Sequence, residues 1–266
     1  MIYIKNNILS KINNWQDDSI HILTDFDRTL TKGNSISSWS ILSNSNLLPE
    51  EYVFERQKLF DYYRPIEIDE SLEFNIKNKF MIEWWKKHFD LFIKYKLSEK
   101  VVNEASLNIN NMSFRDGAFE FLENMNKRNI PVIIISAGIG NFIEHFLIKN
   151  NCYFNNIYLI ANFIKFKNGL AVGLLDNVIH SLNKNEALLP SKVKDLIKDR
   201  GNVILLGDSI SDIKMVLDDK RDSTLKIGFL EVNVELNKDI FESEFDIVCT
   251  DNTSFKDISK KIKIIK

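Results

Sequence analysis

Short runs of apolar residues bounded by turn-forming residues recur along the chain and predict buried β-strands. These runs are Ile20–Phe26, Val132–Ser136, Ile157–Phe163, Val203–Leu206, Leu225–Leu230 and Phe245–Cys249. Between the later runs, apolar residues recur at the spacing of one helix face. These helical stretches are Arg115–Lys127, Asn141–Lys149, Pro190–Lys198, Ile210–Leu217, Val232–Phe241 and Phe255–Ile262.

The alternation of strands and helices predicts an α/β fold, a Rossmann-like doubly wound parallel sheet with helices on both faces. One hairpin interrupts this order. Asn168-Gly169 is a strong signal for a tight turn, and it joins two extended segments, Phe163–Phe166 and Ala171–Val178.

The stretch from residue 32 to residue 112 contains no convincing strand and predicts an inserted helical cap. Met81, Trp84, Trp85, His88, Phe92 and Tyr95 recur there at three to four residues, as on one helix face. We therefore expect residues 1–31 and 113–266 to form the catalytic core. Residues 32–112 form the cap in this prediction.

Composition and charge narrow the class of partner. The 266 residues are 44% hydrophobic and 27% charged, as in an ordinary globular protein, and 35 basic against 37 acidic residues give a net charge of -2. A near-neutral chain lacks the basic surface of a nucleic-acid or membrane binder. We expect a small-molecule substrate, no nucleic-acid polymer, no membrane and a monomer.

The two cysteines, Cys152 and Cys249, lie far apart and have no zinc-like spacing, so they indicate neither a disulfide framework nor a metal finger. The first residues lack the apolar core of a signal peptide, and no apolar run reaches the length of a membrane span. These features favour the reducing cytoplasm.

Asp25–Leu30, with the sequence DFDRTL, is the strongest chemical signal. It follows the first predicted strand, and ligands of open α/β sheets bind at the carboxyl ends of strands. One carboxylate can attack while the other moves protons, and two like charges at one place imply a divalent cation. An Asp-rich turn is the simpler alternative.

Gly207–Asp212, with the sequence GDSISD, follows a second apolar strand. Asp208 and Asp212 are four residues apart, so a helix starting near Ser209 would let both face a metal held by the first pair. Oxygen ligands favour Mg²⁺. Alternatively, Asp208 or Ser209 is a helix N-cap.

Two weaker signals lie between these motifs. Ser136–Gly140 ends a predicted strand and opens a helix, where a hydroxyl and backbone N–H groups could hold a phosphate oxygen, although any tight turn can look alike. Lys184 precedes a helix and could balance phosphoryl charge, or it could be a solvated surface lysine.

The order DxDxT, a strand-end Ser, a Lys before a helix and GDSxxD resembles the haloacid dehalogenase superfamily of phosphotransferring hydrolases. Asp27 and Thr29 look like its phosphatase branch. A closer resemblance, to the cytosolic 5′-nucleotidase III or pyrimidine 5′-nucleotidase family, covers nearly the whole chain. It rests on these motifs together with Tyr62–Asp69, Met81–Trp84, Asn183-Lys184, Leu205–Ser209 and Lys226–Gly228.

The resemblance implies a haloacid dehalogenase-like core with a helical cap, Mg²⁺ as cofactor, and hydrolysis of nucleoside 5′-monophosphates, with cytidine, uridine or 7-methylguanosine monophosphate as candidates and some phosphotransfer to nucleosides. It implies Asp25 as nucleophile and Asp27 as proton donor. The implied metal-site residues are Asp25, Asp27 through its main-chain carbonyl, Asp208 and, in an outer role, Asp212. The implied phosphate or substrate contacts are Thr29, Ser136, Ala137, Gly138 and Lys184.

At the base end, the resemblance implies Glu67 as a base contact and places His88 where the family usually has a Ser. Trp84 or Trp85 could stack on the base. Because adjacent helix positions point about 100° apart, we expect only one of them, Trp85, to line the pocket. A cationic 7-methylguanine would gain cation–π attraction there. An ionised Glu67 would favour cytosine over uracil, because it can only accept hydrogen bonds.

Two alternatives remain. A capped phosphatase acting on an amino-acid or choline phosphate would keep the same catalytic residues and use Glu67 differently. A catalytically silent binding protein on the same scaffold is disfavoured by the four intact motifs.

Overall fold

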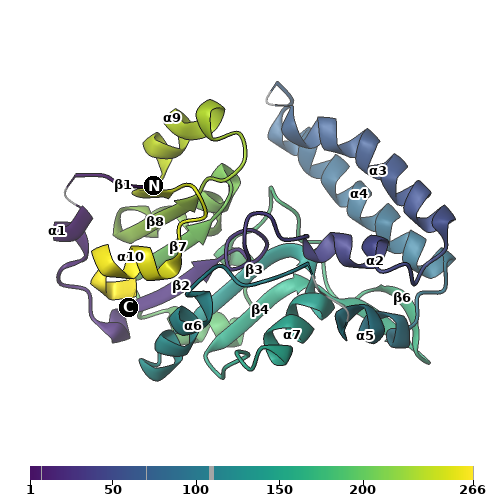
Figure 1. Cartoon of the computed structure of the whole chain (residues 1–266), viewed down its shortest axis with the longest axis horizontal. Helices are drawn as coiled ribbons and strands as arrows, with labels where there is room; N and C mark the ends of the chain where they lie inside the picture. The colour runs from purple at the N-terminus through teal and green to yellow at the C-terminus, as the bar shows by residue number, and fades with distance from the viewer. Residues whose placement is uncertain (7, 70, 108–110, 266) are drawn as a thin grey trace.

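A seven-stranded sheet in the order β1-β9-β8-β7-β2-β3-β4 forms the centre of the computed structural model, which describes residues 1–6, 8–69, 71–107 and 111–265 (Figure 1). Its strands are β1 (Ile2–Ile4), β2 (Ile20–Thr24), β3 (Val132–Ile139), β4 (Ile157–Asn162), β7 (Asn202–Gly207), β8 (Thr224–Phe229) and β9 (Ile247–Cys249). Neighbouring strands are parallel except β1, which runs antiparallel to β9. The predicted parallel sheet is confirmed, and β1 is an addition that its three residues were too short to signal.

Helices cover both faces of the sheet, because successive strand residues point to opposite sides. One face packs on α6 (Ala118–Lys127), α7 (Gly140–Lys149) and α10 (Phe255–Lys261), and the other packs on α8 (Ser191–Ile197). Residues of the first face include Ile22, Ile134 and Ile204, and those of the second include Leu23, Ile133 and Leu205. This arrangement confirms the doubly wound α/β fold.

Two short helices complete the outer layer, α1 (Ile8–Ile12) and α9 (Val234–Glu244). The predicted helix at Ile210–Leu217 is instead a 3₁₀ helix over Ile210–Met215. Ser209 is its N-cap: the Ser209 hydroxyl accepts from the Ser211 N–H, and the Asp212 carboxylate accepts from the Ser209 N–H.

Among its described residues, the predicted cap segment contains the 3₁₀ helix η2 (Ser38–Ser40) and the α-helices α2 (Ile41–Asn44), α3 (Glu50–Ile68), α4 (Phe74–Lys94) and α5 (Glu99–Leu107). In Figure 1, α3 and α4 run side by side and project away from the helices that cover the sheet. The ring of Tyr63 on α3 stacks on that of Trp84 on α4, with centroids 5.7 Å apart. Met81, Trp84, Trp85, His88 and Phe92 are buried, as their spacing predicts.

Helix α5 lies against the core rather than with α3 and α4. The hydroxyl of Ser106 on α5 is 2.7 Å from Nδ1 of His145 on α7, and Lys149 on α7 donates to the carbonyl of Leu107. The domain boundaries at residues 32 and 112 stay a prediction.

A separate hairpin of β5 (Ile164–Lys167) and β6 (Leu170–Leu174) turns at Asn168 and Gly169, both with positive φ, so the predicted tight turn is confirmed. The hairpin attaches to the start of α5: the Ala171 N–H donates to the Leu97 carbonyl, and the Glu99 N–H donates to the Gly169 carbonyl.

In the described part of the chain, no helix is both long and apolar enough to cross a membrane.

Candidate active site

The carboxyl ends of β2, β3 and β7 lie side by side at the centre of the sheet, where the strand order reverses. Such a switch point is the usual ligand site of open α/β sheets. Asp25 continues β2, and its N–H donates to the Leu206 carbonyl of β7 over 3.0 Å. This register brings the DFDRTL and GDSISD motifs together.

Lys184 joins the two motifs through a pair of ionic contacts. Its Nζ lies 2.7 Å from Oδ1 of Asp25 and 3.0 Å from Oδ1 of Asp212, and all three side chains are buried. Burial alone would lower the pKa of Lys184, but the Asp212 and Asp25 carboxylates outweigh it and raise the pKa. Lys184 is therefore a buried cation of the site and not a surface lysine.

The carboxylates of Asp25, Asp208 and Asp212 can each place an oxygen within 4.8 Å of the others. Burial, and then the charges of Asp212 and Asp25, raise the pKa of Asp208 well above its usual range. One lysine does not balance this concentration of negative charge. The residues therefore fit a hard divalent cation such as Mg²⁺.

Asp212 is the most constrained of the three carboxylates. Its Oδ2 accepts the N–H groups of Asp208 and Ser209, and its Oδ1 accepts Lys184. Because these groups already use both oxygens, Asp212 orients the loop and the lysine, in keeping with the outer role that the resemblance implies.

Asp27 is held by Ser38, a residue that no sequence pattern indicated. The Ser38 N–H donates to Oδ1 of Asp27 over 3.0 Å, and its hydroxyl donates to Oδ2 over 2.7 Å. Burial raises the pKa of Asp27, although these two hydrogen bonds oppose the shift. Desolvation, rather than the neighbouring carboxylate, is thus the main influence that favours its protonated form.

The segment Ser136–Gly140 differs from the predicted strand-to-helix turn. β3 continues past Ser136 to Ile139 through a register shift, and α7 begins only at Gly140. The register shift between Ile135 and Ile139 forms a bulge, in which backbone groups of β3 are not paired with β4. Within it the Ser136 hydroxyl accepts the Gly138 N–H over 3.1 Å.

Thr29 is fully buried, and its role as a phosphate contact stays a prediction. Its hydroxyl is buried without a hydrogen-bond partner among the described residues. Its carbonyl accepts Nε of Arg115, and the Arg28 carbonyl accepts Nη2 of the same arginine. Thr29 therefore lies in the packed interior beneath the DFDRTL loop. Arg115, which no sequence pattern indicated, holds that loop in place through these hydrogen bonds.

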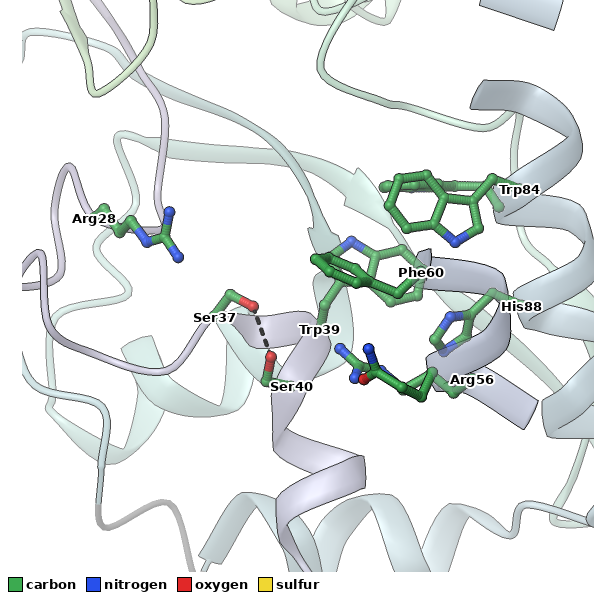
Figure 2. A pocket seen from close by; sticks show the side chains of 10 residues that line it. Arg28, Ser37, Trp39, Ser40, Arg56, Phe60, Trp84 and His88 are labelled. Atoms are coloured by element: carbon green, nitrogen blue, oxygen red, sulfur yellow. Dashed lines mark hydrogen bonds between the residues drawn. The ribbon is translucent and has the colours of Figure 1, made fainter. Parts of the chain in front are cut away.

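The aromatic pocket is a cavity of about 370 Å³ between η2 (Ser38–Ser40), α3 and α4 (Figure 2). It is lined by Arg28, Ser37, Trp39, Ser40, Arg56, Gln57, Phe60, Trp84, Trp85 and His88. Both Trp84 and Trp85 line it, so the expectation that only one would do so is wrong. Their rings pack edge to face with centroids 4.7 Å apart, and together they form part of the cavity wall.

Glu67 does not line the aromatic pocket. It lines a second cavity of about 570 Å³, the cap–core cleft, together with Lys184 and Asp208. Its Oε1 accepts the Ser181 hydroxyl over 2.6 Å, and its Oε2 pairs with Arg64. The structure thus brings together Asp25, Asp208, Asp212 and Lys184, and Glu67 lines a different cavity from Trp85 and His88. Arg28 lines both cavities.

Comparisons with known proteins identify the family of this chain. Residues 22–266 match the pyrimidine 5′-nucleotidase (UMPH-1) family. The 7-methylguanosine phosphate-specific 5′-nucleotidase of Drosophila melanogaster is 34% identical over 244 residues, which cover 88% of this chain and 76% of the relative. The Homo sapiens protein of the same name is 33% identical, covering 87% of this chain and 79% of its own length.

Among solved structures, cytosolic 5′-nucleotidase IIIB bound to cytidine superposes with a TM-score of 0.87 and 31% identity, covering 99% of this chain and 93% of that one. A substrate-bound phosphoserine phosphatase, with 19% identity and a TM-score of 0.57 over 93% of this chain and 98% of that chain, shares the fold alone. This chain therefore belongs to the pyrimidine 5′-nucleotidase (UMPH-1) family.

Proposed function

We propose that this protein is a magnesium-dependent 5′-nucleotidase that converts nucleoside 5′-monophosphates to nucleoside and phosphate through an aspartyl-phosphate. The single observation that carries the proposal is the cluster at the strand ends. Lys184 contacts both Asp25 and Asp212, and a carboxylate oxygen of Asp208 lies within 4.8 Å of oxygens of these two aspartates. Family membership and the relatives named as 5′-nucleotidases support the substrate class.

Asp25 acts as the nucleophile. Its carboxylate oxygen forms a bond to phosphorus as the bond from phosphorus to O5′ breaks, and this divides one difficult displacement into two easier ones. Lys184 orients Asp25 through its 2.7 Å contact and places positive charge where the phosphoryl oxygens gather.

Asp27 acts as the general acid and then as the base. In the first step its proton goes to the leaving O5′. In the second step its carboxylate takes a proton from the water that attacks phosphorus, which releases phosphate and restores Asp25. Ser38 fixes the orientation of Asp27 through both carboxylate oxygens.

Asp25, the main-chain carbonyl of Asp27 and Asp208 would hold Mg²⁺, with Asp212 in an outer position. When bound, the ion supplies positive charge that offsets the negative charge of the reacting phosphoryl group. Ser136, Ala137 and Gly138 contribute the loop that surrounds the phosphate in this proposal, and Trp85, His88 and Glu67 are the proposed contacts at the base end.

The relatives include a putative cytosolic 5′-nucleotidase 3 of Caenorhabditis elegans, which supports a cytoplasmic location for this protein as well. We propose that it works there as a monomer on a free nucleotide.

The primary test is phosphate release from nucleoside 5′- and 3′-monophosphates with and without Mg²⁺. We expect release from the 5′ series only, dependent on Mg²⁺, and none from the Asp25→Asn variant, because an amide is not a nucleophile toward phosphorus. Equal cleavage of the 3′ series, or full activity in excess chelator, would refute the proposal.

A leaving-group comparison tests the role of Asp27. Asp27→Asn loses protonation of the leaving oxygen, a step worth roughly 10² to 10⁴ in rate. Nitrophenyl phosphate needs little protonation, so its hydrolysis should fall far less than that of a nucleotide. Equal losses on both substrates would remove Asp27 from the role of acid.

Thermal unfolding tests the metal site without relying on activity. A ligand that binds only the folded state raises Tm. Mg²⁺ should therefore raise the Tm of the wild-type protein, and Asp208→Asn should abolish that rise. Because the substitution also removes a half-buried carboxylate that Asp25 and Asp212 repel, Asp208→Asn in chelator should be at least as stable as the wild type.

A further inference from the structure

A buried carboxylate lies two residues beyond Lys184 and takes no part in the proposed chemistry. Glu186 begins η3 (Glu186–Leu188), and its side chain is 2% exposed. Its Oε1 lies 2.8 Å from Nε2 of His21, and its Oε2 accepts Nζ of Lys220 over 3.2 Å. A charge buried to this degree is costly unless it is paired and hydrogen-bonded, and here the two partners engage both of its oxygens.

The contact between His21 and Glu186 is a hydrogen bond from a neutral ring to an ionised carboxylate. Burial raises the pKa of Glu186, but the hydrogen bonds and charges of His21 and Lys220 outweigh it and lower the pKa. Burial lowers the pKa of His21, although Glu186 opposes that shift. Because an ionised carboxylate can only accept hydrogen bonds, Nε2 of His21 carries the proton and donates.

One partner of Glu186 lies on the strand that leads to Asp25. His21 and Asp25 are four residues apart on β2 and its continuation, so their side chains leave on the same face, about 13 Å from one another along the strand. Lys184 contacts the residue at the carboxyl end of the strand, and Glu186 contacts the residue near its amino end. The segment that carries Lys184 and Glu186 is thus attached to β2 at two levels.

The other partner of Glu186 lies close in sequence to Asp212. Lys220 is part of η5 (Asp218–Ser223), which follows the 3₁₀ helix that carries Asp212. Lys220 donates to Glu186, as Lys184 donates to Asp212. The two neighbouring parts of the core that hold Lys184 therefore also hold Glu186, with the signs of the charges reversed.

The other polar side chains of this segment make less buried contacts. Asn183 donates to the carbonyl of Val178 and accepts the N–H of His180, both within the same loop. Asn185 donates to the carbonyl of Lys214 at the exposed surface. Glu186 therefore provides the buried polar attachment of the segment next to Lys184.

We propose that Glu186 is a positioning residue for Lys184: by fixing the chain two residues away, it sets where the ammonium group lies between its two carboxylates. This inference rests on the proposed function, which gives Lys184 its role at the phosphoryl group, and it adds the residue that controls the position of that charge. Glu186 itself touches neither the substrate nor the reacting atoms.

The flexibility of lysine gives the physical reason. Its long side chain has many rotamers and loses considerable conformational freedom when it is held in one place. Contacts of 2.7 and 3.0 Å to Asp25 and Asp212 orient the ammonium group only if the backbone of Lys184 stays fixed. A displacement of about 1 Å at a catalytic group can reduce the rate about 100-fold. An ionised carboxylate held on both sides keeps such a displacement small.

Glu186→Gln tests the inference, because it keeps the shape of the side chain and removes its charge. We expect kcat to fall by roughly 10- to 100-fold, and by the same factor on a nucleotide and on nitrophenyl phosphate. The losses should be equal because Lys184 acts on the phosphoryl group that both substrates share. An unchanged kcat, or a loss confined to the nucleotide, would overturn the inference.

Two variants of His21 test the same attachment while Glu186 stays in place. His21→Gln keeps an N–H donor near the position of Nε2 and should retain most of the kcat. His21→Leu removes the donor and should lower kcat on both substrates. Equal kcat values in the two variants would show that this hydrogen bond does not position Lys184, and would overturn the inference.

Asp246→Asn is the matched control for general destabilisation. Asp246 is another buried carboxylate, and it accepts the N–H of Lys226 over 2.8 Å and lies 3.9 Å from Nζ of Lys11. It directly precedes β9, at the edge of the sheet opposite to the strand ends that carry the site. Its loss should lower Tm and leave kcat unchanged. An equal fall of kcat in Asp246→Asn and Glu186→Gln would overturn the inference.

Chemical labelling of lysines measures the position of Lys184 without relying on activity. A buried ammonium group in two ionic contacts reacts slowly with acetic anhydride, and peptide mass spectrometry gives the extent of labelling at each lysine. In Glu186→Gln, labelling of Lys184 should increase several-fold, whereas that of Lys192, which is exposed on α8, should not change.

Unchanged labelling of Lys184 would overturn the inference even in an active enzyme. Increased labelling together with no phosphate release by the wild type from any substrate would instead support the role of Glu186 in placing Lys184 and refute the proposed function itself.

Discussion

Arg115 shows how one buried side chain can hold the loop that follows β2. It is 2% exposed and donates to the carbonyls of Arg28 and Thr29 over 2.6 and 3.0 Å. It also pairs with Glu231 and lies over the ring of Phe229. Arg28 has φ of 63°, a conformation that is unfavourable for a side chain of its size. Arg115 therefore stabilises an unusual backbone directly beside Asp27.

Replacing Arg115 by Met should lower the free energy of unfolding by about 3–5 kcal/mol, because Glu231 would keep a largely buried charge without its partner. The kcat should fall as well, because the loop carbonyls lose their donors. Urea unfolding and steady-state kinetics measure the two effects. Arg221→Met is the control, since its ion pair with Asp218 is exposed and should contribute less than about 1 kcal/mol. Equal effects of the two variants would contradict this account.

Gly138 allows the end of β3 to approach Ser38 closely. A Cβ at this position would lie 1.8 Å from the Ser38 hydroxyl oxygen and 3.1 Å from Oδ2 of Asp27. Gly138→Ala should therefore displace Ser38 from Asp27 and reduce kcat on nucleotides more than on nitrophenyl phosphate. Gly201→Ala, where a Cβ meets nothing within 4 Å, should leave kcat unchanged. A Gly138→Ala enzyme with normal kcat would show that this contact does not position the acid.

At the scale of elements, the β5–β6 hairpin joins the core to the segment that leads into α5. Its turn needs positive φ at Asn168 and Gly169, and two backbone hydrogen bonds tie it to Leu97 and Glu99. A small antiparallel unit thus fixes where the chain returns from α4 to the core.

Gly169→Ala should weaken this attachment. A Cβ there meets no neighbour within 4 Å, so the effect comes only from the left-handed backbone, at a cost of about 1–2 kcal/mol. Amide hydrogen exchange at Glu99 and Ala171 should accelerate, while exchange in β2 and β7 should not. Uniform acceleration across the molecule would indicate global destabilisation and contradict a local role for the hairpin.

At the scale of the whole molecule, buried neutral histidines link stability to pH. Burial lowers the pKa of His88 to about 3 and that of His180 to about 4, against an ordinary value of 6.5. Below about pH 6.5, these two histidines therefore bind protons in the unfolded chain while they stay neutral in the folded chain. For these groups stability is complete above about pH 6.5 and declines as the pH falls below it.

His88→Gln should make the free energy of unfolding less dependent on pH. Below pH 6.5 the contribution of His88 falls by about 1.4 kcal/mol per pH unit, and glutamine does not titrate. Urea unfolding of both proteins in chelator at pH 7.5, 6.5 and 5.5 gives the comparison. The carboxylates titrate in both proteins, so only the difference between the two slopes is diagnostic. Identical slopes would mean that His88 is protonated in the folded protein.

The sequence alone predicted most strands of the central sheet and the carboxylates at their carboxyl ends. Strands rich in Val, Ile and Leu form where helices can cover both of their faces, so the local pattern was sufficient to predict their positions along the chain. The DFDRTL and GDSISD motifs follow such strands, and parallel strands place their carboxyl ends at one edge of the sheet. The proximity of Asp25 and Asp208 was therefore predictable before any coordinates.

Only the tertiary structure decided which side chains face one another across elements that are distant in sequence. Ser38 reaches Asp27, and Arg115 reaches the carbonyls of Arg28 and Thr29, through contacts that have no local periodicity and leave no pattern in the chain. Glu67 on α3 and Trp85 on α4 line different cavities, and this depends on how the two helices pack on the core. Which cavity each predicted base contact lines was thus hidden from the sequence, because it depends on that packing.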